Sequence, residues 1–242
     1  MNSQEMNINN LTQLWELGAK RNGFLFKNEN YSIAKIPYSD WPNKLWLKMP
    51  ANSKLLAVIL QENSSEKFTI SLWEEDPKLH HKLIDMNYTQ SNELIGMSLN
   101  LDGFVKKQER LALKRVYNPD QAKRWSELFE MGFGYRISQS TVESTMDEIQ
   151  YYIAGYNGFE LGTVVLFVHP AEIAGIHSMG VIPEFRRQGF ARNILIEVLA
   201  KAKLTSAKMA TLQASKAGEP LYKEIGFKEN FKLYNYQLNK TN

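Results

Sequence analysis

The stretch MGVIPEFRRQGFAR, residues 179–192, joins two segments of opposite periodicity and determines how the second half of the chain folds. The apolar run before it predicts a strand over residues 173–181, which Pro183 ends. After it, apolar side chains recur at helical spacing from Phe190 to Lys203, with charged side chains on the other face. The stretch is therefore the junction between a strand and the first turn of a helix.

A junction of this kind is suited to binding an anion, because the first N–H groups of a helix lack intrahelical partners and lie at the positive end of its dipole. Gly189 lets the backbone approach a phosphate without a Cβ in the way, and Ala191 is the next smallest choice. Arg187 and Arg192 flank the turn and can add charge-assisted hydrogen bonds to a diphosphate. The residues predict a ligand that carries a pyrophosphate.

The run VIPEFRRQGFA (residues 181–191) closely resembles the acetyl-coenzyme A loop of the GNAT superfamily of N-acetyltransferases. Two later clusters, LQAS at 212–215 and LYKEIGF at 221–227, are similar to the same family. Residues from about 109 to 242 follow the family's order of strands and helices, whereas residues 1–105 contain no phosphate loop. The resemblance therefore covers half of the chain.

The fold that the resemblance implies is α/β (α+β), with a mixed, mostly antiparallel twisted sheet flanked by helices. We expect two tandem domains: residues 1–105 as a degenerate GNAT-like or accessory domain, and 106–242 as the acetyltransferase domain with the acetyl-coenzyme A site. Residues 83–88 echo residues 222–227, since both join a helix to an apolar strand, which favours a decayed copy. The alternatives are two unrelated helix-to-strand turns, or a first half that covers the acceptor site or mediates dimerisation.

The resemblance further implies that acetyl-coenzyme A is the cosubstrate and that a primary amine attacks its thioester directly. The backbone of Met179 and Val181 would bind the pantetheine and the thioester carbonyl, where an N–H stabilises the oxyanion. Two positions depart from the commonest pattern, Ala191 where Gly is common and Ser215 where many members have Asn. The cofactor-binding residues implied in this way are Met179, Gly180, Val181, Arg186, Arg187, Gln188, Gly189, Phe190, Ala191, Arg192, Ser215 and Tyr222.

Two residues are candidates for proton transfer. Tyr222 matches the family's tyrosine that faces the coenzyme sulfur, where a phenol can protonate the departing thiolate; the alternative is a tyrosine that only packs. An amine with a pKa near 10.4 must lose a proton before it attacks, and His177, on the strand that leads into the site, is the first candidate base. Strict alternation puts His177 on the side of Met179 and Val181, although a bulge would reverse this. Glu172 and Ser178 are weaker candidates.

Composition excludes several other classes of protein. There is no cysteine, so disulfides, thiolate metal sites and thiol nucleophiles are absent, as is common in the cytosol. The four histidines lack the spacing of a zinc site, and a net charge of +3 without basic blocks argues against nucleic acid. No secretory signal is visible, and the apolar runs are far shorter than the roughly 20 residues that span a bilayer. We expect a cytoplasmic monomer or homodimer with no metal and no membrane partner.

Two other functions stay open at this point. A non-catalytic protein that binds or senses acyl-coenzyme A would keep the same loop, and a nucleotide-binding protein would also use an Arg-rich turn, although Walker and Rossmann patterns are absent. The remaining pattern predicts helices over residues 11–19, 77–86, 118–131 and 220–225, and strands over 31–36, 44–48, 55–60, 68–73, 94–101, 111–116, 151–154, 162–168, 209–213 and 233–238. Asn157-Gly158 predicts a hairpin between two of them.

Overall fold

The computed structural model describes residues 2–48, 52–63, 67–73, 75–105, 111–169 and 172–239. Within these residues, eleven strands form one sheet in the order β1-β2-β3-β4-β11-β5-β10-β9-β8-β7-β6. The helices are α1 (Ser3–Asn22), α2 (Ser53–Glu62), α3 (Pro77–Asp85), α4 (Pro119–Phe133), α5 (Gln139–Thr145), α6 (Phe190–Lys203) and α7 (Glu219–Ile225). The strands are β1 (Phe24–Lys27), β2 (Tyr31–Lys35), β3 (Lys44–Leu47), β4 (Thr69–Leu72), β5 (Tyr88–Asn100), β6 (Ala112–Arg115), β7 (Gln150–Tyr156), β8 (Phe159–Val168), β9 (Ile173–Val181), β10 (Met209–Ser215) and β11 (Lys228–Leu238).

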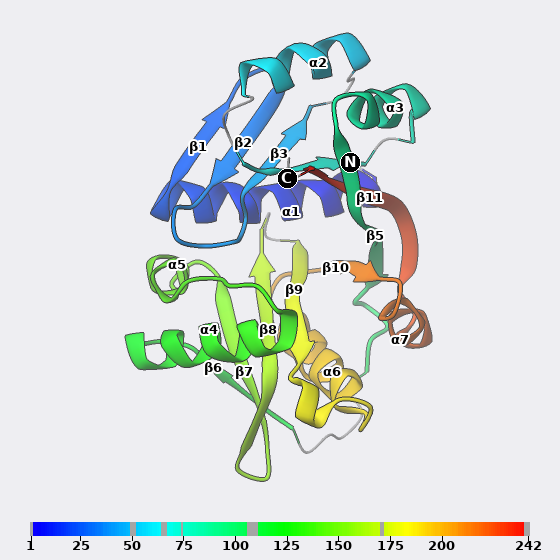
Figure 1. Cartoon of the computed structure of the whole chain (residues 1–242). Helices are drawn as coiled ribbons and strands as arrows, with labels where there is room; N and C mark the ends of the chain where they lie inside the picture. Colours follow the sequence, from blue (N-terminus) through cyan, green and yellow to red (C-terminus); the bar gives the residue numbers. More distant parts are fainter. Residues whose placement is uncertain are drawn as a thin grey trace.

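The helices cover the sheet in two groups. In Figure 1, α2 and α3 lie with β1 to β3 in the upper part, α4, α5 and α6 lie with β6 to β9 in the lower part, and α1 crosses between them. In the lower part, α6 packs into one apolar core and α4 and α5 pack into a second, separate core. No helix within the described residues is both long and apolar enough to cross a membrane.

The two halves exchange their last strands. β5 ends the first half, yet it pairs with β10 along seven residues and with β11 on its other edge. β11 ends the second half and pairs with β4 of the first. Each half therefore completes its sheet with a strand of the other, and the predicted boundary near residue 106 falls where the two strand sets interleave. Residues 106–110 lie outside the described residues, so the division into two domains stays a prediction.

The geometry around the two similar segments repeats. The parallel pair β3 and β4 is joined through α2, and the parallel pair β9 and β10 is joined through α6. α3 is followed by Asn87 with φ 67° and α7 by Gly226 with φ 106°, and an antiparallel strand begins directly after each. Leu83, fully buried, stands in the first half where Tyr222 stands in the second. The two segments therefore share a local geometry, while descent of one half from a copy of the other stays a prediction.

Most predicted elements are present, and one is wrong. α4 begins after Asn118, whose side chain accepts a hydrogen bond from the N–H of Gln121, and β7 and β8 form the antiparallel hairpin across Asn157-Gly158. Residues 55–60 were expected to be a strand but lie within α2. The reason is visible in the pattern, because Leu56, Ile59 and Leu60 recur at helical spacing and are the residues that the helix buries. β1 and α5 were not predicted.

α1 is fixed to the middle of the sheet by a buried asparagine, Asn7, which is fully buried. Its amide nitrogen donates to the carbonyl oxygens of Met97 in β5, at 2.9 Å, and Leu212 in β10, at 3.3 Å. Its amide oxygen accepts from Nε2 of Gln213 at 2.6 Å. The helix is thereby joined to both strands of the exchanged pair.

Asn10, one turn further along α1, makes the equivalent contacts with β8 and β9 and is also fully buried. Its amide nitrogen donates to the carbonyls of Phe167 and His169 at 3.1 and 2.6 Å, and its amide oxygen lies 3.0 Å from Nε2 of His177. A Cβ placed on Gly175 would lie 1.9 Å from that oxygen, so only glycine allows α1 to approach this closely.

We predict that Asn10→Ala destabilises the protein by about 3 kcal/mol, because it removes the hydrogen bonds of a fully buried amide to the carbonyls of Phe167 and His169 and to the imidazole of His177. Urea unfolding at pH 7 measures the loss. Asn239→Ala removes exposed hydrogen bonds and is the matched control, expected to change stability by less than about 0.5 kcal/mol. Equal losses in the two variants would show that Asn10 does not anchor α1.

Candidate active site

The sheet opens between β9 and β10. The two strands pair in parallel only from Ile173 and Met209 to Gly175 and Thr211, although β9 continues to Val181 and β10 to Ser215. On its other edge β9 remains paired with β8, and β10 remains paired with β5. Beyond Gly175 the two strands therefore diverge, and within the described residues the backbone edge of β9 that faces β10 has no strand partner.

A bulge in β9 sets which side chains face which side. His177 pairs with Val165 and Gly180 pairs with Thr163, so three steps along β9 match two along β8. Ser178 is the extra residue of the bulge and has φ 49°. Its carbonyl accepts a hydrogen bond from Oγ1 of Thr163 at 3.0 Å. The prediction by strict alternation, which put His177 on the side of Met179 and Val181, is therefore wrong. The structure has the bulge that was the alternative, and it turns His177 to the opposite side.

After the bulge, the side chains of Met179 and Val181 pack against the core that contains α6. Gly180 faces the opposite side, where a Cβ placed on it would lie 2.5 Å from the ring of Phe133 in α4. Nothing in the local sequence indicated that Phe133 covers this strand, because the contact joins residues from separate elements. The ring of His177 also faces away from the α6 core, toward Asn10 of α1.

His177 is enclosed rather than open to a substrate. The residue is 8% exposed, and burial lowers the pKa of its imidazole to about 4, partly offset by the side chain of Gln213. Because the Asn10 amide nitrogen is engaged with two carbonyls, its oxygen accepts and Nε2 of His177 donates. The imidazole of His177 is neutral, covered by α1 and hard to protonate. These properties favour a structural role for His177 over that of a general base.

The weaker base candidates lie elsewhere on the strand. Glu172 precedes β9 and forms an exposed ion pair with Lys208, at the end of the strand opposite to the arginine-rich junction. Ser178 occupies the bulge, where its carbonyl is bound to Thr163. These contacts do not place the carboxylate of Glu172 or the hydroxyl of Ser178 beside Val181.

The junction after β9 has the geometry of an open helix N-terminus. A single 3₁₀ turn, Pro183–Phe185, is followed by Arg187 with φ 59° and by Gly189 with φ 83°. Gly189 is the N-cap of α6, and no side chain caps the helix within the described part of the chain. A Cβ on Gly189 would meet no atom within 4 Å, so the space above this turn is open. The first-turn N–H groups thus face a volume that an anion can enter.

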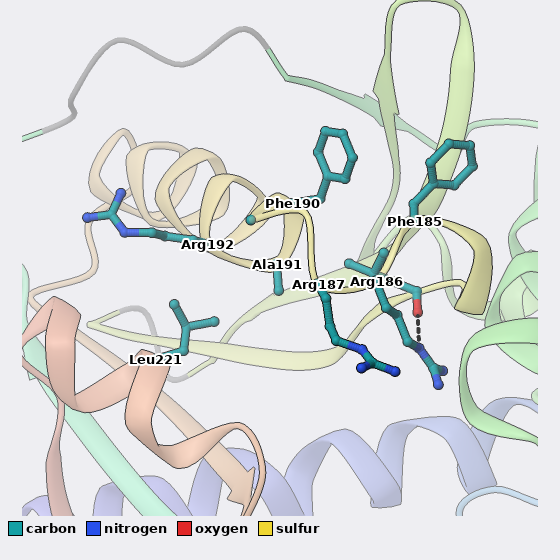
Figure 2. Close-up of a pocket in the computed structure, with 9 residues that line it drawn as sticks. Phe185, Arg186, Arg187, Phe190, Ala191, Arg192 and Leu221 are labelled. Atoms are coloured by element: carbon teal, nitrogen blue, oxygen red, sulfur yellow. Dashed lines mark hydrogen bonds between the residues drawn. The ribbon is translucent and has the colours of Figure 1, made fainter.

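A pocket of about 230 Å³ lies against this turn and is closed on its far side by α7 (Figure 2). It brings together part of the predicted set and adds Phe185 and Leu221. Its lining residues are Val181, Phe185, Arg186, Arg187, Gly189, Phe190, Ala191, Arg192 and Leu221. The predicted residues Met179, Gly180, Gln188, Ser215 and Tyr222 do not line it and lie along the opening of the sheet or beside the turn.

The arginine side chains of the junction differ in their availability. Arg186 donates from Nε to the carbonyl of Val181 at 3.0 Å, the dashed line in Figure 2, and from Nη2 to that of Gly132 at 2.7 Å. Arg192 contacts Glu224 at 3.3 Å. Arg187 is exposed, and no hydrogen bond or ion pair of its side chain is found in the part of the chain that the structure describes. Arg187 is therefore the guanidinium most open to a ligand, whereas Arg186 fixes the end of β9.

Across the opening, the end of β10 and the start of α7 form a tight turn. The Oγ of Ser215 accepts from the N–H of Gly218 at 3.2 Å, and the ring of Tyr222 lies 3.1 Å from a Cβ placed on Gly218. Burial raises the pKa of the Tyr222 phenol to about 12, so it keeps its proton at neutral pH. Ser215 and Tyr222 are thus brought to one place.

Comparisons with known proteins agree with this geometry. Residues 147–229 match the model of the acetyltransferase (GNAT) domain family. An uncharacterized N-acetyltransferase of Chlorobaculum tepidum is 29% identical over 108 residues, which are 43% of this chain and 65% of that protein, so less than two thirds of that relative is matched. Solved structures of GCN5-related N-acetyltransferases show the same fold. That from Kribbella flavida has a TM-score of 0.72 at 12% identity, covering 97% of this chain and 96% of that one. That from Sphaerobacter thermophilus has a TM-score of 0.63 at 14% identity, covering 88% and 78%.

The structure combines a mixed twisted sheet that opens between two parallel strands with a glycine turn at the start of the next helix. Residues 147–229 thus match a GNAT acetyltransferase domain, and the fold around them is that of GCN5-related N-acetyltransferases. The predicted fold class is confirmed, and structural similarity over nearly the whole chain extends the fold to the first half.

The buried imidazole gives a testable dependence of stability on pH. Its pKa is about 4 in the folded protein and near 6.5 when unfolded, so the unfolded state binds the proton first as the pH falls below 6.5. Between pH 7 and pH 4.5, the wild type should therefore lose about 2 to 3 kcal/mol more unfolding free energy than His177→Gln. Urea unfolding at both pH values measures this difference. His81→Gln, at an exposed histidine, is the control and should lose as much unfolding free energy between the two pH values as the wild type. An equal loss in His177→Gln would show that His177 is not buried in the neutral form.

Proposed function

We propose that this protein transfers an acetyl group from acetyl-coenzyme A to a primary amine by direct attack of the amine on the thioester. The observation that carries the proposal is the open helix N-terminus at Gly189, which lies beside the pocket and directly after the strand edge that β10 leaves free. The family match supports the same donor. Recognition of the amine depends on other parts of the molecule.

The pyrophosphate of the donor would be held by the backbone from Gln188 to Ala191 together with Arg187. Gly189 fits this role, because its φ of 83° disfavours other residues and the space over it is open. Arg187 would add a charge-assisted hydrogen bond, since its guanidinium is not engaged elsewhere in the described residues. Arg192 would add positive charge from the first turn of α6, although it shares that charge with Glu224.

The reacting carbonyl would lie along β9 between the bulge and Val181. A peptide N–H on this free edge can donate to the oxyanion that forms when the amine attacks, and a rigid donor is more effective than a mobile one. Arg186 supplies rigidity, because it binds the carbonyl of Val181 and that of Gly132 at the same time. We therefore assign Arg186 to positioning the strand rather than to binding phosphate.

Tyr222 would face the departing sulfur. A phenol with a pKa of about 12 is a weaker acid than a thiol, whose ordinary pKa is near 8.5, so full proton transfer to the thiolate is uphill by roughly 3 to 4 pKa units. A hydrogen bond from the phenol to the developing thiolate needs no such transfer. We therefore assign Tyr222 as a donor that stabilises the leaving group, with solvent supplying the final proton.

The proton of the attacking amine would leave through water. An imidazole with a pKa near 4 is a poor acceptor for the proton of an alkyl ammonium, whose pKa is near 10.4, and α1 covers the ring. We assign His177 to positioning β9 against α1.

Tandem descent of the two halves, with residues 1–105 as the copy without a phosphate loop, is part of this proposal.

The first test concerns the donor. Arg187→Gln should weaken the binding of acetyl-coenzyme A by about 5- to 30-fold, the value of one charge-assisted hydrogen bond of roughly 1 to 2 kcal/mol. Isothermal titration measures the dissociation constant, with NAD and ATP as ligands that should not bind. Arg21→Gln, which breaks an exposed ion pair with Glu148, is the matched control and should bind normally. Absence of any coenzyme A binding by the wild type would refute the proposed function.

The second test concerns the leaving group. Tyr222→Phe should lower kcat by about 10- to 150-fold, the loss of one hydrogen bond to a charged atom, while the affinity for acetyl-coenzyme A changes little. Release of free thiol, followed with a chromogenic reagent, gives the rate. Tyr117→Phe, at an exposed tyrosine, should leave the rate unchanged. A normal rate for Tyr222→Phe would show that water alone stabilises the thiolate.

A further inference from the structure

The side of β9 opposite the α6 core is covered by aromatic rings. The ring of Phe133 lies against the backbone of Gly180, within 2.5 Å of the position that a Cβ would take. Phe133 stacks on Phe129 with ring centres 4.4 Å apart, and Tyr135 stands edge-on to both, at 5.1 Å from Phe129 and 6.0 Å from Phe133. Phe133 is 36% exposed and Tyr135 is 41% exposed, so the cluster forms part of the surface. We call Phe133, Tyr135 and Asp40, described next, the aromatic-acid face.

Asp40 reaches this face from the first half of the chain. Its backbone N–H donates to the carbonyl of Arg136 at 2.9 Å, and its carboxylate accepts from the N–H of Arg136 at 2.8 Å. Oγ of Ser39 adds a bond from the N–H of Ser138 at 3.2 Å. The loop that contains Asp40 is thereby locked to the segment that follows α4, and the carboxylate is held at a fixed place.

The negative charge of Asp40 is not balanced locally. It forms no ion pair with any residue that the structure describes, and it is exposed. Tyr135 lies close enough that this charge, after burial, contributes to raising the pKa of its phenol to about 12. The phenol therefore stays neutral, and the face places one carboxylate beside the electron-rich surfaces of two rings, while the guanidinium of Arg186 is bound to the carbonyl of Gly132 next to Phe133.

We propose that the aromatic-acid face is the acceptor site and that the acceptor is an alkyl amine with a second positive charge, such as a diamine, whose distal ammonium is held by Asp40 and Tyr135. This inference rests on the proposed function, which puts the thioester beside Gly180. The rings of Phe133 and Tyr135, with centres 6.0 Å apart, lie between Gly180 and Asp40. Asp40 is thus too far to take the proton of the reacting nitrogen, and it binds the other end of the molecule.

The chemistry of the step fits this division. The reacting ammonium loses one proton to water, its lone pair forms the C–N bond to the acetyl carbon, and the C–S bond breaks. The nitrogen then loses a second proton to water to give the neutral amide, and the thiolate takes a proton from solvent. The reacting end thereby loses its positive charge, whereas the distal ammonium keeps its charge throughout. The rings of Phe133 and Tyr135 would cover the methylene chain between the two ends.

The experiment compares amines of equal length that differ only in the distal charge. The wild type should acetylate 1,6-diaminohexane with a kcat/KM about five- to tenfold above that of hexylamine, after correction for the two equivalent amines, and the preference should shrink as salt is raised. Asp40→Asn keeps the oxygen that accepts from Arg136 but removes the charge, and it should reduce the preference to nearly one. Asp85→Asn, at an exposed carboxylate on α3, is the matched control and should retain it.

A second variant addresses the rings. Tyr135→Leu keeps an apolar surface but removes the aromatic face, and it should lower the preference for the diamine while leaving the affinity for acetyl-coenzyme A unchanged. Equal kcat/KM for the diamine and hexylamine in the wild type, or an unchanged preference in Asp40→Asn, would overturn the inference while leaving the proposed function intact.

Direct binding separates the inference from the proposed function. If no amine is acetylated although coenzyme A binds, the proposed function fails and the inference is decided by titration of 1,6-diaminohexane into the protein saturated with coenzyme A. Asp40→Asn should then weaken diamine binding about fivefold relative to Asp85→Asn. Equal binding by the two variants would overturn the inference.

Discussion

The opening between β9 and β10 depends on the strands that hold their outer edges. β9 is bonded to β8 up to Val181, and β10 is bonded to β5 up to Ser215, so each strand is fixed on one side while they part on the other. β5 belongs to the first half of the chain. The backbone edge that we assign to the thioester is therefore maintained by a strand from the half that lacks a phosphate loop, and the exchange of β5 and β11 makes the two halves one structural unit.

α1 adds a second constraint on the same place. Its two buried asparagines bind carbonyls of three strands, β5, β8 and β10, and of the segment after β8, at the level where β9 and β10 separate. A helix fixed in this way by hydrogen bonds resists sliding more than one held by apolar contacts alone, because each displaced bond leaves a buried group without a partner. His177 takes part in this attachment, which explains why a histidine on the strand next to the site is neutral and enclosed.

Local features of the site could be predicted from the sequence because they depend on neighbours along the chain. Pro183, Gly189 and the periodicity of residues 190–203 specify the strand end, the open turn and the helix with little help from the rest of the molecule. The face of His177 could not be predicted, because Ser178, a residue with no intrinsic preference for positive φ, takes the extra position of the bulge. The exchange of strands was equally hidden, since it depends on pairing between residues more than 100 positions apart, such as Leu94 and Ser215.

The same distinction separates donor recognition from acceptor recognition. The residues that we assign to the donor lie between Met179 and Tyr222, within one continuous part of the chain. The aromatic-acid face needs Asp40 from one half and Tyr135 from the other, joined by hydrogen bonds between their loops. Changes in the loop around Asp40 can therefore alter which amine is accepted without disturbing the turn at Gly189. The first half, in which the sequence shows no phosphate loop, supplies the strand β5 that holds β10 and, in our proposal, the charge that selects the acceptor.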